Sequence, residues 1–274
     1  MENRKLKMET AHAILLAIIE GLTEFLPVSS TGHMIIASSG LGIADLPFTK
    51  TFTVAIQLGA ILAVVALYWK KFINFKDPKF YIKLAIAVVP ALIIGKLLDD
   101  YIDEKLGNPV FIAFSLVGGG IILLFIDKLF RNPEIKDEKE ISYLRAFFIG
   151  CWQVLAVIFP GLSRSGATII GGMQQKLTRD VAAEFSFFLA VPTMLAATGY
   201  KLLKHVKDNG MFSKDEFSLL MIGNIVAFVV AILAIKVFIG MVKKYGFRIW
   251  GVYRIIVGGL VLLIHYFFFP LHVI

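Results

Sequence analysis

Two acidic residues interrupt an apolar stretch near the start of the chain. Glu20 and Glu24 follow an apolar run that begins at Ala11, and their spacing of four places both on one face of a helix. Ionisable groups are costly inside membrane segments and usually indicate function there. A hard divalent ion suits such a carboxylate pair, because it takes carboxylate and phosphate oxygens together. The alternative is a structural carboxylate that caps a neighbouring turn.

Hydroxyl residues and a histidine follow shortly after Pro27. The run comprises Ser29, Ser30, Thr31, Gly32 and His33. Hydroxyl residues ahead of an apolar stretch predict a helix N-cap, and a helix N-terminus is also a binding site for phosphate. For Ser29 and Thr31, capping and binding are equally compatible with the pattern. His33 could exchange a proton near neutral pH or attack phosphorus itself.

A second polar turn follows Pro160. Its residues are Gly161, Ser163, Arg164, Ser165 and Gly166. The fork of the Arg164 guanidinium matches phosphate oxygens, and the glycines allow the backbone to approach a ligand closely. The alternative for Arg164 is a salt bridge to Glu20 or Glu24, and both interpretations are compatible in the ligand-free protein. Together these groups suit phosphoryl transfer, which depends mainly on positioning and charge stabilisation.

The composition places this chemistry in a membrane. Of the 274 residues, 58% are hydrophobic, whereas soluble domains contain about 45–50%. The net charge is +8, but the basic residues cluster between apolar runs. They therefore indicate membrane topology and contacts with lipid head groups, and no nucleic-acid partner is expected. A membrane location implies a substrate with a lipid tail.

The apolar segments predict an all-α polytopic protein with one membrane domain over 1–274. A spanning helix needs about 20 mostly apolar residues. Six segments qualify, at 52–69, 80–98, 109–126, 181–203, 217–239 and 249–269. The regions 11–44 and 143–173 are instead broken by proline, which is typical of re-entrant hairpins around a protein-lined cavity. The pattern predicts about ten helical segments.

The two hairpins resemble each other, which predicts two repeats over 10–130 and 143–269. Glu20 precedes Pro27 by seven residues, as Gln153 precedes Pro160. Because each half carries three spans, the second half must be inverted, with the site near the membrane midplane. The excess of Lys and Arg in four loops predicts that these loops are cytoplasmic, so that both termini and the site face outward.

Three further polar residues are given lesser roles. Arg254 lies near a span end and is expected to extend toward the membrane interface. Gln57 and Gln153 are expected to hydrogen-bond across helices.

Both motifs resemble those of a known family. Glu20-Gly-Leu-Thr-Glu-Phe-Leu-Pro-Val-Ser-Ser-Thr-Gly-His33 and Pro160-Gly-Leu-Ser-Arg-Ser-Gly-Ala-Thr168 are similar to the signatures of the bacterial undecaprenyl-diphosphate phosphatases, the bacitracin-resistance proteins. The resemblance covers nearly the whole chain. It implies hydrolysis of undecaprenyl diphosphate to undecaprenyl phosphate and phosphate, which recycles the lipid carrier of peptidoglycan synthesis and protects against bacitracin. It also implies a bacterial plasma-membrane location and a requirement for Mg²⁺ or Ca²⁺.

The resemblance also implies roles for the site residues. Glu20 and Glu24 would hold the metal or transfer protons, and Arg164 would clamp the diphosphate. Either Ser30 or His33 would be the nucleophile. The remaining hydroxyl and glycine residues of the two turns would contact the head group. The sequence is compatible with a homodimer, and with a transporter of polyprenyl phosphate as an alternative function, since inverted repeats with broken helices also occur in transporters.

Overall fold

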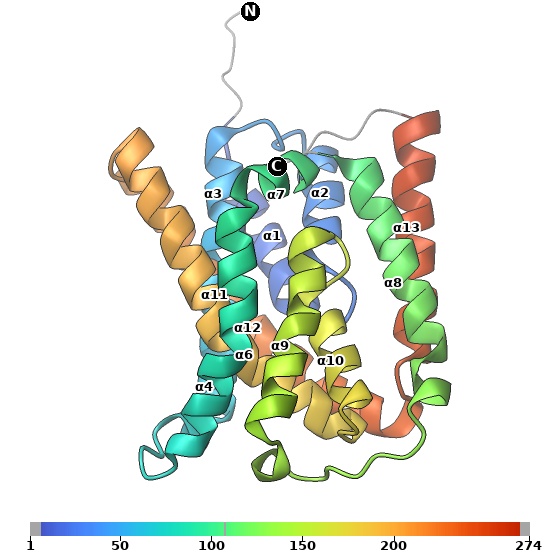
Figure 1. Ribbon diagram of the computed structural model, residues 1–274. Helices are drawn as coiled ribbons and strands as arrows, with labels where there is room; N and C mark the ends of the chain where they lie inside the picture. The colour runs from blue at the N-terminus through green and yellow to red at the C-terminus, as the bar shows by residue number, and fades with distance from the viewer. Residues whose placement is uncertain (1–6, 107, 269–274) are drawn as a thin grey trace, which may run out of the picture.

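The computed structural model describes residues 7–106 and 108–268, and within these ranges the regular structure is helical apart from one isolated bridge between Ile135 and Leu177. Figure 1 shows the helices standing roughly side by side. Their bounds are α1 Thr10–Thr23, α2 Ser30–Gly40, α3 Pro47–Ala55, α4 Gln57–Leu67, α5 Trp69–Phe72, α6 Pro78–Leu97, α7 Asp99–Leu106, α8 Pro109–Leu129, the 3₁₀ helix η1 Glu138–Glu140, α9 Tyr143–Ile158, α10 Arg164–Gln174, α11 Arg179–Asn209, α12 Lys214–Tyr245 and α13 Arg248–Phe267.

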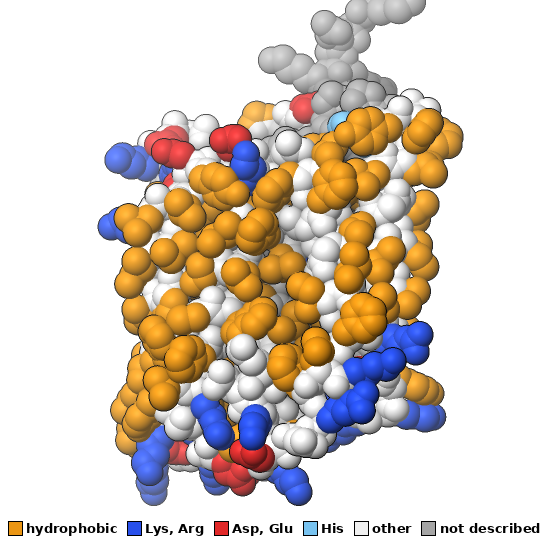
Figure 2. All heavy atoms as spheres, turned by 45° about the vertical axis from the view of Figure 1, so that its right-hand side comes forward, with side chains coloured by type: hydrophobic (Ala, Val, Ile, Leu, Met, Phe, Trp, Pro, Cys, Tyr) orange, Lys and Arg blue, Asp and Glu red, His pale blue; other side chains and the backbone are white. Residues whose placement is uncertain are grey.

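Six spans are confirmed in the described part of the chain. Each is long and apolar enough to cross a bilayer, and one of them combines α3 and α4. The others are α6, α8, α11, α12 and α13. Figure 2 shows hydrophobic side chains across the middle of one face, with most of the visible Lys and Arg at the lower end and a smaller group at the upper end. The protein is therefore a multi-pass membrane protein, as predicted.

The first span is not one continuous helix. The helical pattern breaks at Ile56, between α3 and α4. Just beyond the break, the Gly59 amide donates to Asn224 Oδ1 of α12 at 2.7 Å. A side chain on another helix thus accepts a hydrogen bond that the local backbone would otherwise take. This break, together with the short helices α5 and α7, explains why α1 to α13 exceed the predicted number of about ten segments.

Both proline-broken regions form a helix, a turn and a second helix. With 14 residues, α1 is about 21 Å long, which is too short for a hydrocarbon core of about 30 Å. In Figure 1 the pair α1–α2 enters from the upper end and the pair α9–α10 from the lower end, and the turns of both pairs lie in the middle of the molecule. This arrangement is compatible with the predicted re-entrant hairpins.

The helix neighbours are also compatible with two repeats. The first hairpin helix, α1, packs on α12 of the second half, and α9 packs in the same way on α6 of the first half. The most extensive helix pair is formed by α8 and α13, which stand together at the right of Figure 1. Small residues allow close approach, since Gly150 of α9 lies directly against the Ala87 backbone of α6. The inverted relation of the halves stays a prediction.

Candidate active site

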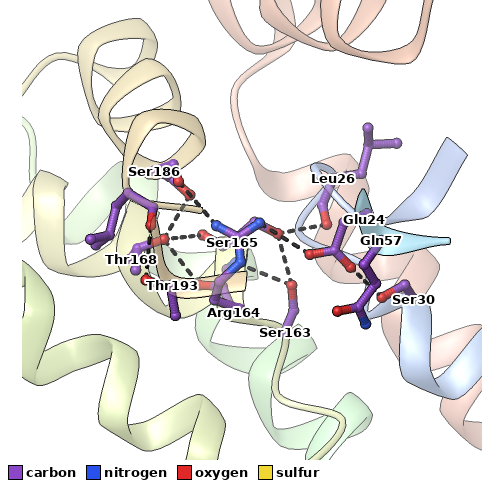
Figure 3. Close-up of polar contacts among 12 residues, drawn as sticks. Glu24, Leu26, Ser30, Gln57, Ser163, Arg164, Ser165, Thr168, Ser186 and Thr193 are labelled. Atoms are coloured by element: carbon purple, nitrogen blue, oxygen red, sulfur yellow. Dashed lines mark hydrogen bonds and ion pairs between the residues drawn. The ribbon is translucent and has the colours of Figure 1, made fainter. Parts of the chain in front are cut away.

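The turns between the hairpin helices contact each other directly. Ser165 Oγ donates to the Leu26 carbonyl at 2.8 Å, and Arg164 Nη2 lies 3.1 Å from Glu24 Oε1. Figure 3 shows Arg164 between Ser186 on one side and Glu24 on the other. Residues separated by 140 positions in the sequence therefore form one site.

The two turns share the same local geometry. Ser29 and Ser163 are the N-caps of α2 and α10, and each side-chain oxygen accepts a hydrogen bond from the amide of a glycine three residues later. Both serines have positive φ angles, 67° and 74°. Such conformations cost about 1–3 kcal/mol for residues other than glycine and cluster at functional sites. The helix N-termini that follow begin with Ser30 and Arg164 respectively.

Glu24 connects these two helix N-termini. Ser30 Oγ donates to Glu24 Oε2 at 2.6 Å, while Arg164 bonds the other carboxylate oxygen. Glu24 is only 9% exposed, so water does not compete strongly for either bond. A hydroxyl that donates to a buried carboxylate has the geometry of a nucleophile beside its general base.

Two buried polar atoms of the site lack a hydrogen-bond partner in the described part of the chain. They are Arg164 Nε, a donor, and Glu20 Oε1, an acceptor. The rest of the Arg164 guanidinium is bonded, because Nη1 donates to the Ser186 carbonyl at 3.0 Å. Buried polar groups are normally paired, so these atoms indicate a place for an anion beside Arg164 and for a cation or proton beside Glu20.

The carboxylates fit a metal ion that binds together with the substrate. Among the described residues, no cluster of three or more His, Cys, Asp or Glu could enclose an ion. Glu20 and Glu24 are both buried and close enough to interact. Mg²⁺ is commonly held by one or two carboxylates together with substrate phosphates and water. This donor set suits that mode rather than a closed protein cage.

A cavity of about 610 Å³ opens beside the two turns. Its polar end is lined by Glu24, Ser29, Ser30, Thr31, Ser163 and Arg164. Its other walls are mainly apolar and come from α6, α9 and α11, with Leu92, Val157 and Met194 as examples. The cavity thus combines an anion-binding end with a surface for a hydrocarbon chain.

A smaller cavity of about 290 Å³ lies on the other side of Ser30. Most of its lining residues are of polar types, among them Glu20, Lys50, Lys204 and His205. The two cavities share the lining residues Ser30, Thr31, Gln57 and Lys201. Ser30 therefore lies against both cavities.

Asp99 of α7 lines the larger cavity among several lysines. Its carboxylate bonds Lys201 at 3.1 Å, and Lys204 lies 3.5 Å away. Burial acts to raise the pKa of Asp99, but the hydrogen bonds and charges of the two lysines hold that pKa below its ordinary value. The carboxylate therefore stays ionised and offsets part of the positive charge there.

Several predicted residues lie outside both cavities. His33 Nδ1 is 2.8 Å from the Ser29 carbonyl and Nε2 is 2.7 Å from Tyr253 Oη, so both ring nitrogens already have partners. Ser165 and the glycines Gly32 and Gly166 serve the turns themselves, through the contact with Leu26 and the two N-caps. Neither cavity is lined by any of these four residues.

Two residues, Gln57 and Arg254, are more closely tied to the site than the sequence predicts. Gln57 lines both cavities and lies beside Ser30 and Glu24 in Figure 3. The interface position predicted for Arg254 is wrong, because the side chain is 1% exposed and bonds backbone carbonyls inside the protein. The sequence around a basic residue near a span end does not indicate whether its side chain extends to the membrane interface or is buried inside the protein. The space for Arg254 comes from Gly119 and Gly120, which belong to a different span, α8.

Comparison with known proteins agrees with this geometry. The family model described as bacitracin resistance protein BacA matches residues 13–260. The chain belongs to this family. A protein of Flavobacterium johnsoniae named undecaprenyl-diphosphatase is 57% identical, and the match covers 97% of this chain and 100% of the relative. A protein of the same name in Porphyromonas gingivalis is 52% identical, and that match covers 94% of this chain and 97% of the relative. The relative with that name in Aquifex aeolicus is 46% identical over 90% and 94%.

Proposed function

We propose that this BacA-family chain hydrolyses undecaprenyl diphosphate to undecaprenyl phosphate and inorganic phosphate. The observation that carries the proposal is the position of Glu24, which accepts the Ser30 hydroxyl on one oxygen and pairs with Arg164 on the other. In this proposal Ser30, Glu24 and Arg164 are the nucleophile, the base and the phosphate-binding cation, and all three line the larger cavity. The names of the relatives support the same activity.

In this mechanism Ser30 is the nucleophile. Its Oγ attacks the terminal phosphorus while its proton passes to Glu24, and the bond from phosphorus to the bridging oxygen breaks. Glu24 then returns the proton to the departing undecaprenyl phosphate, which frees the carboxylate to deprotonate a water that attacks the phosphoserine. The bond from phosphorus to Ser30 Oγ breaks, and Glu24 gives the proton of that water to Oγ, so that inorganic phosphate leaves and both side chains return to their starting forms. Arg164 and the N-termini of α2 and α10 stabilise the negative charge on the phosphoryl oxygens.

Glu20 and Glu24 are the residues that would hold Mg²⁺ or Ca²⁺. The unpaired Glu20 oxygen and the acidic pair support this assignment. When bound, a divalent ion supplies positive charge against the diphosphate oxygens. His33 is assigned a supporting role, because its ring bonds the Ser29 carbonyl and Tyr253 rather than facing the larger cavity.

The two cavities suggest separate routes for tail and phosphate. The hydrocarbon chain would occupy the apolar part of the larger cavity, while water and phosphate would exchange through the smaller cavity, which Lys50 and Lys204 line. The larger cavity is lined by residues of α7 and the smaller one by the last turns of α11, and Figure 1 shows both segments at its upper end. Most of the Lys and Arg visible in Figure 2 lie at the opposite, lower end. By the positive-inside rule, the proposed orientation has the site open to the outer face of a bacterial plasma membrane.

Phosphate release by the purified protein in detergent tests the proposal. Wild type should release phosphate from undecaprenyl diphosphate in the presence of Mg²⁺ or Ca²⁺ and stop when the ion is chelated. Acid quenching during turnover should trap phosphate on Ser30, detectable by mass spectrometry. A folded wild-type protein that releases no phosphate would refute the hydrolase and favour the alternative function, transport of polyprenyl phosphate.

A further inference from the structure

A buried arginine lies behind the two turns. Arg254 of α13 is 1% exposed, and all five of its N–H donors have a backbone carbonyl within hydrogen-bond distance. Two of the acceptors, Ser115 and Leu116, belong to α8. The other three are Pro27 of the first turn, at 3.1 Å, and Gly161 and Leu162 of the second turn, at 3.1 and 2.6 Å.

These bonds connect the two turns through one rigid group. Nη1 alone bridges Pro27 and Leu162, which lie on different turns. The guanidinium is planar, so it fixes the relative position of its acceptors as well as their distance. Since Ser30 and Arg164 follow within three residues of these carbonyls, the bridge also sets where the nucleophile and the phosphate-binding cation lie.

Helix α8 leaves space for the guanidinium. A side-chain carbon on Gly119 would overlap Arg254 Nη2, and one on Gly120 would lie 3.0 Å from Arg254 Cβ. Gly166 of the second turn is also close, because a carbon there would lie 3.2 Å from Nη1. Gly118, by contrast, faces open space. The guanidinium therefore has little freedom to move while its five acceptors hold it.

We infer that Arg254 is a positioning residue that holds the two catalytic turns at the separation which one phosphate requires. The inference rests on the proposed function and adds a residue to it. Burying a guanidinium among neutral carbonyls is expensive, and a simple helix contact could be made by apolar residues at lower cost. An apolar side chain in the same place could not connect the two turns by hydrogen bonds.

The Arg254→Lys variant tests the inference, because lysine keeps the charge but loses the planar fork and has three donors instead of five. A displacement of about 1 Å can reduce turnover about 100-fold, so we expect kcat to fall about 10- to 100-fold with a much smaller change in KM. The matched control is Arg179→Lys. Arg179 Nε lies 2.6 Å from Asp127 Oδ1, and Arg179 lines neither cavity. The kcat of Arg179→Lys should therefore equal that of wild type.

A second pair of variants perturbs Arg254 without replacing it. Gly119→Ala places a methyl group against Nη2 and should lower kcat in the same way, while Gly118→Ala on the same helix should leave kcat unchanged. Thermal unfolding in detergent identifies variants that fail to fold. Wild-type kcat in folded Arg254→Lys and Gly119→Ala would overturn the inference.

Amide hydrogen exchange separates this inference from the proposed function. In Arg254→Lys, exchange should accelerate at 26–33 and 160–166 relative to Arg179→Lys, whether or not the protein releases phosphate. Equal protection of both turns in the two variants would overturn the positioning role. Absence of phosphate release from wild type, with accelerated exchange in Arg254→Lys, would refute only the proposed function.

Discussion

Replacing Glu24 by glutamine removes the proposed general base while it preserves the size of the side chain. The amide oxygen of the glutamine can still accept one hydrogen bond, and Arg164 keeps its bond to the Ser186 carbonyl. The site should therefore stay assembled. Ser30 would lose the carboxylate that lies 2.6 Å from its hydroxyl and takes its proton.

When Mg²⁺ is supplied at a concentration that keeps the proposed metal site occupied, the expected loss follows from the missing base. General base catalysis contributes about 10²- to 10⁴-fold to a rate. At about 1.36 kcal/mol per factor of ten, Glu24→Gln should raise the activation free energy by about 2.7 to 5.4 kcal/mol. Because Arg164 stays near its position and still faces the diphosphate, KM should change much less than kcat.

Steady-state phosphate release in detergent, measured over a range of lipid concentrations, gives both constants. Glu184→Gln is the matched control, since Glu184 is another carboxylate within a span but lies beside Tyr68 and lines neither cavity. Its kcat should equal that of wild type. If Glu24→Gln retains kcat within about threefold, or if Glu184→Gln loses as much, the assignment of Glu24 as the base is wrong.

Three further predictions follow from the same geometry. Ser30→Ala should lower kcat at least about 10³-fold, whereas His33→Ala should lower it less than about tenfold, and equal losses in phosphate release would contradict the choice of nucleophile. Glu20→Gln should raise the Mg²⁺ concentration for half-maximal activity by about tenfold or more in a metal titration, and an unchanged titration would remove Glu20 from the metal site. Gly150→Ala should destabilise the protein by about 1–3 kcal/mol, because the added methyl group meets the Ala87 backbone. Gly240→Ala is the control, since its methyl group faces open space and should leave the stability unchanged. Equal unfolding midpoints of the two variants in detergent would show that α6 and α9 can move apart without cost.

Much of the fold follows from local patterns in the sequence. The lengths of the apolar segments identified the six spans, because a bilayer of fixed thickness requires about 20 apolar residues in each spanning helix. Pro27 and Pro160 marked the turns, and the polar residues beside them marked the site. These signals are local: each depends on a residue and its near neighbours, so one sequence is enough to find them.

The remainder depends on contacts between distant residues. The break at Ile56 accompanies an acceptor supplied by Asn224, which no feature of the 47–67 segment indicates. Arg254 resembles a basic residue at a span end, yet its acceptors come from α8 and from both turns. His33 looked as reactive as Ser30 because the sequence gives residue types but not the direction of a side chain. Only the fold shows that Ser30 faces Glu24 and that His33 faces Tyr253.

The two turns explain how a chain with similar halves can build an asymmetric site. Each turn has a serine N-cap with positive φ followed by a helix N-terminus, so each offers the same electrostatic attraction for phosphate. The residue directly after the cap differs, and it is Ser30 in one turn and Arg164 in the other. Two serines there would provide a nucleophile without a strong cation, and two arginines would bind phosphate without attacking it. Catalysis therefore requires both turns at a fixed separation, which is why a rigid bridge such as Arg254 has consequences for turnover as well as for stability.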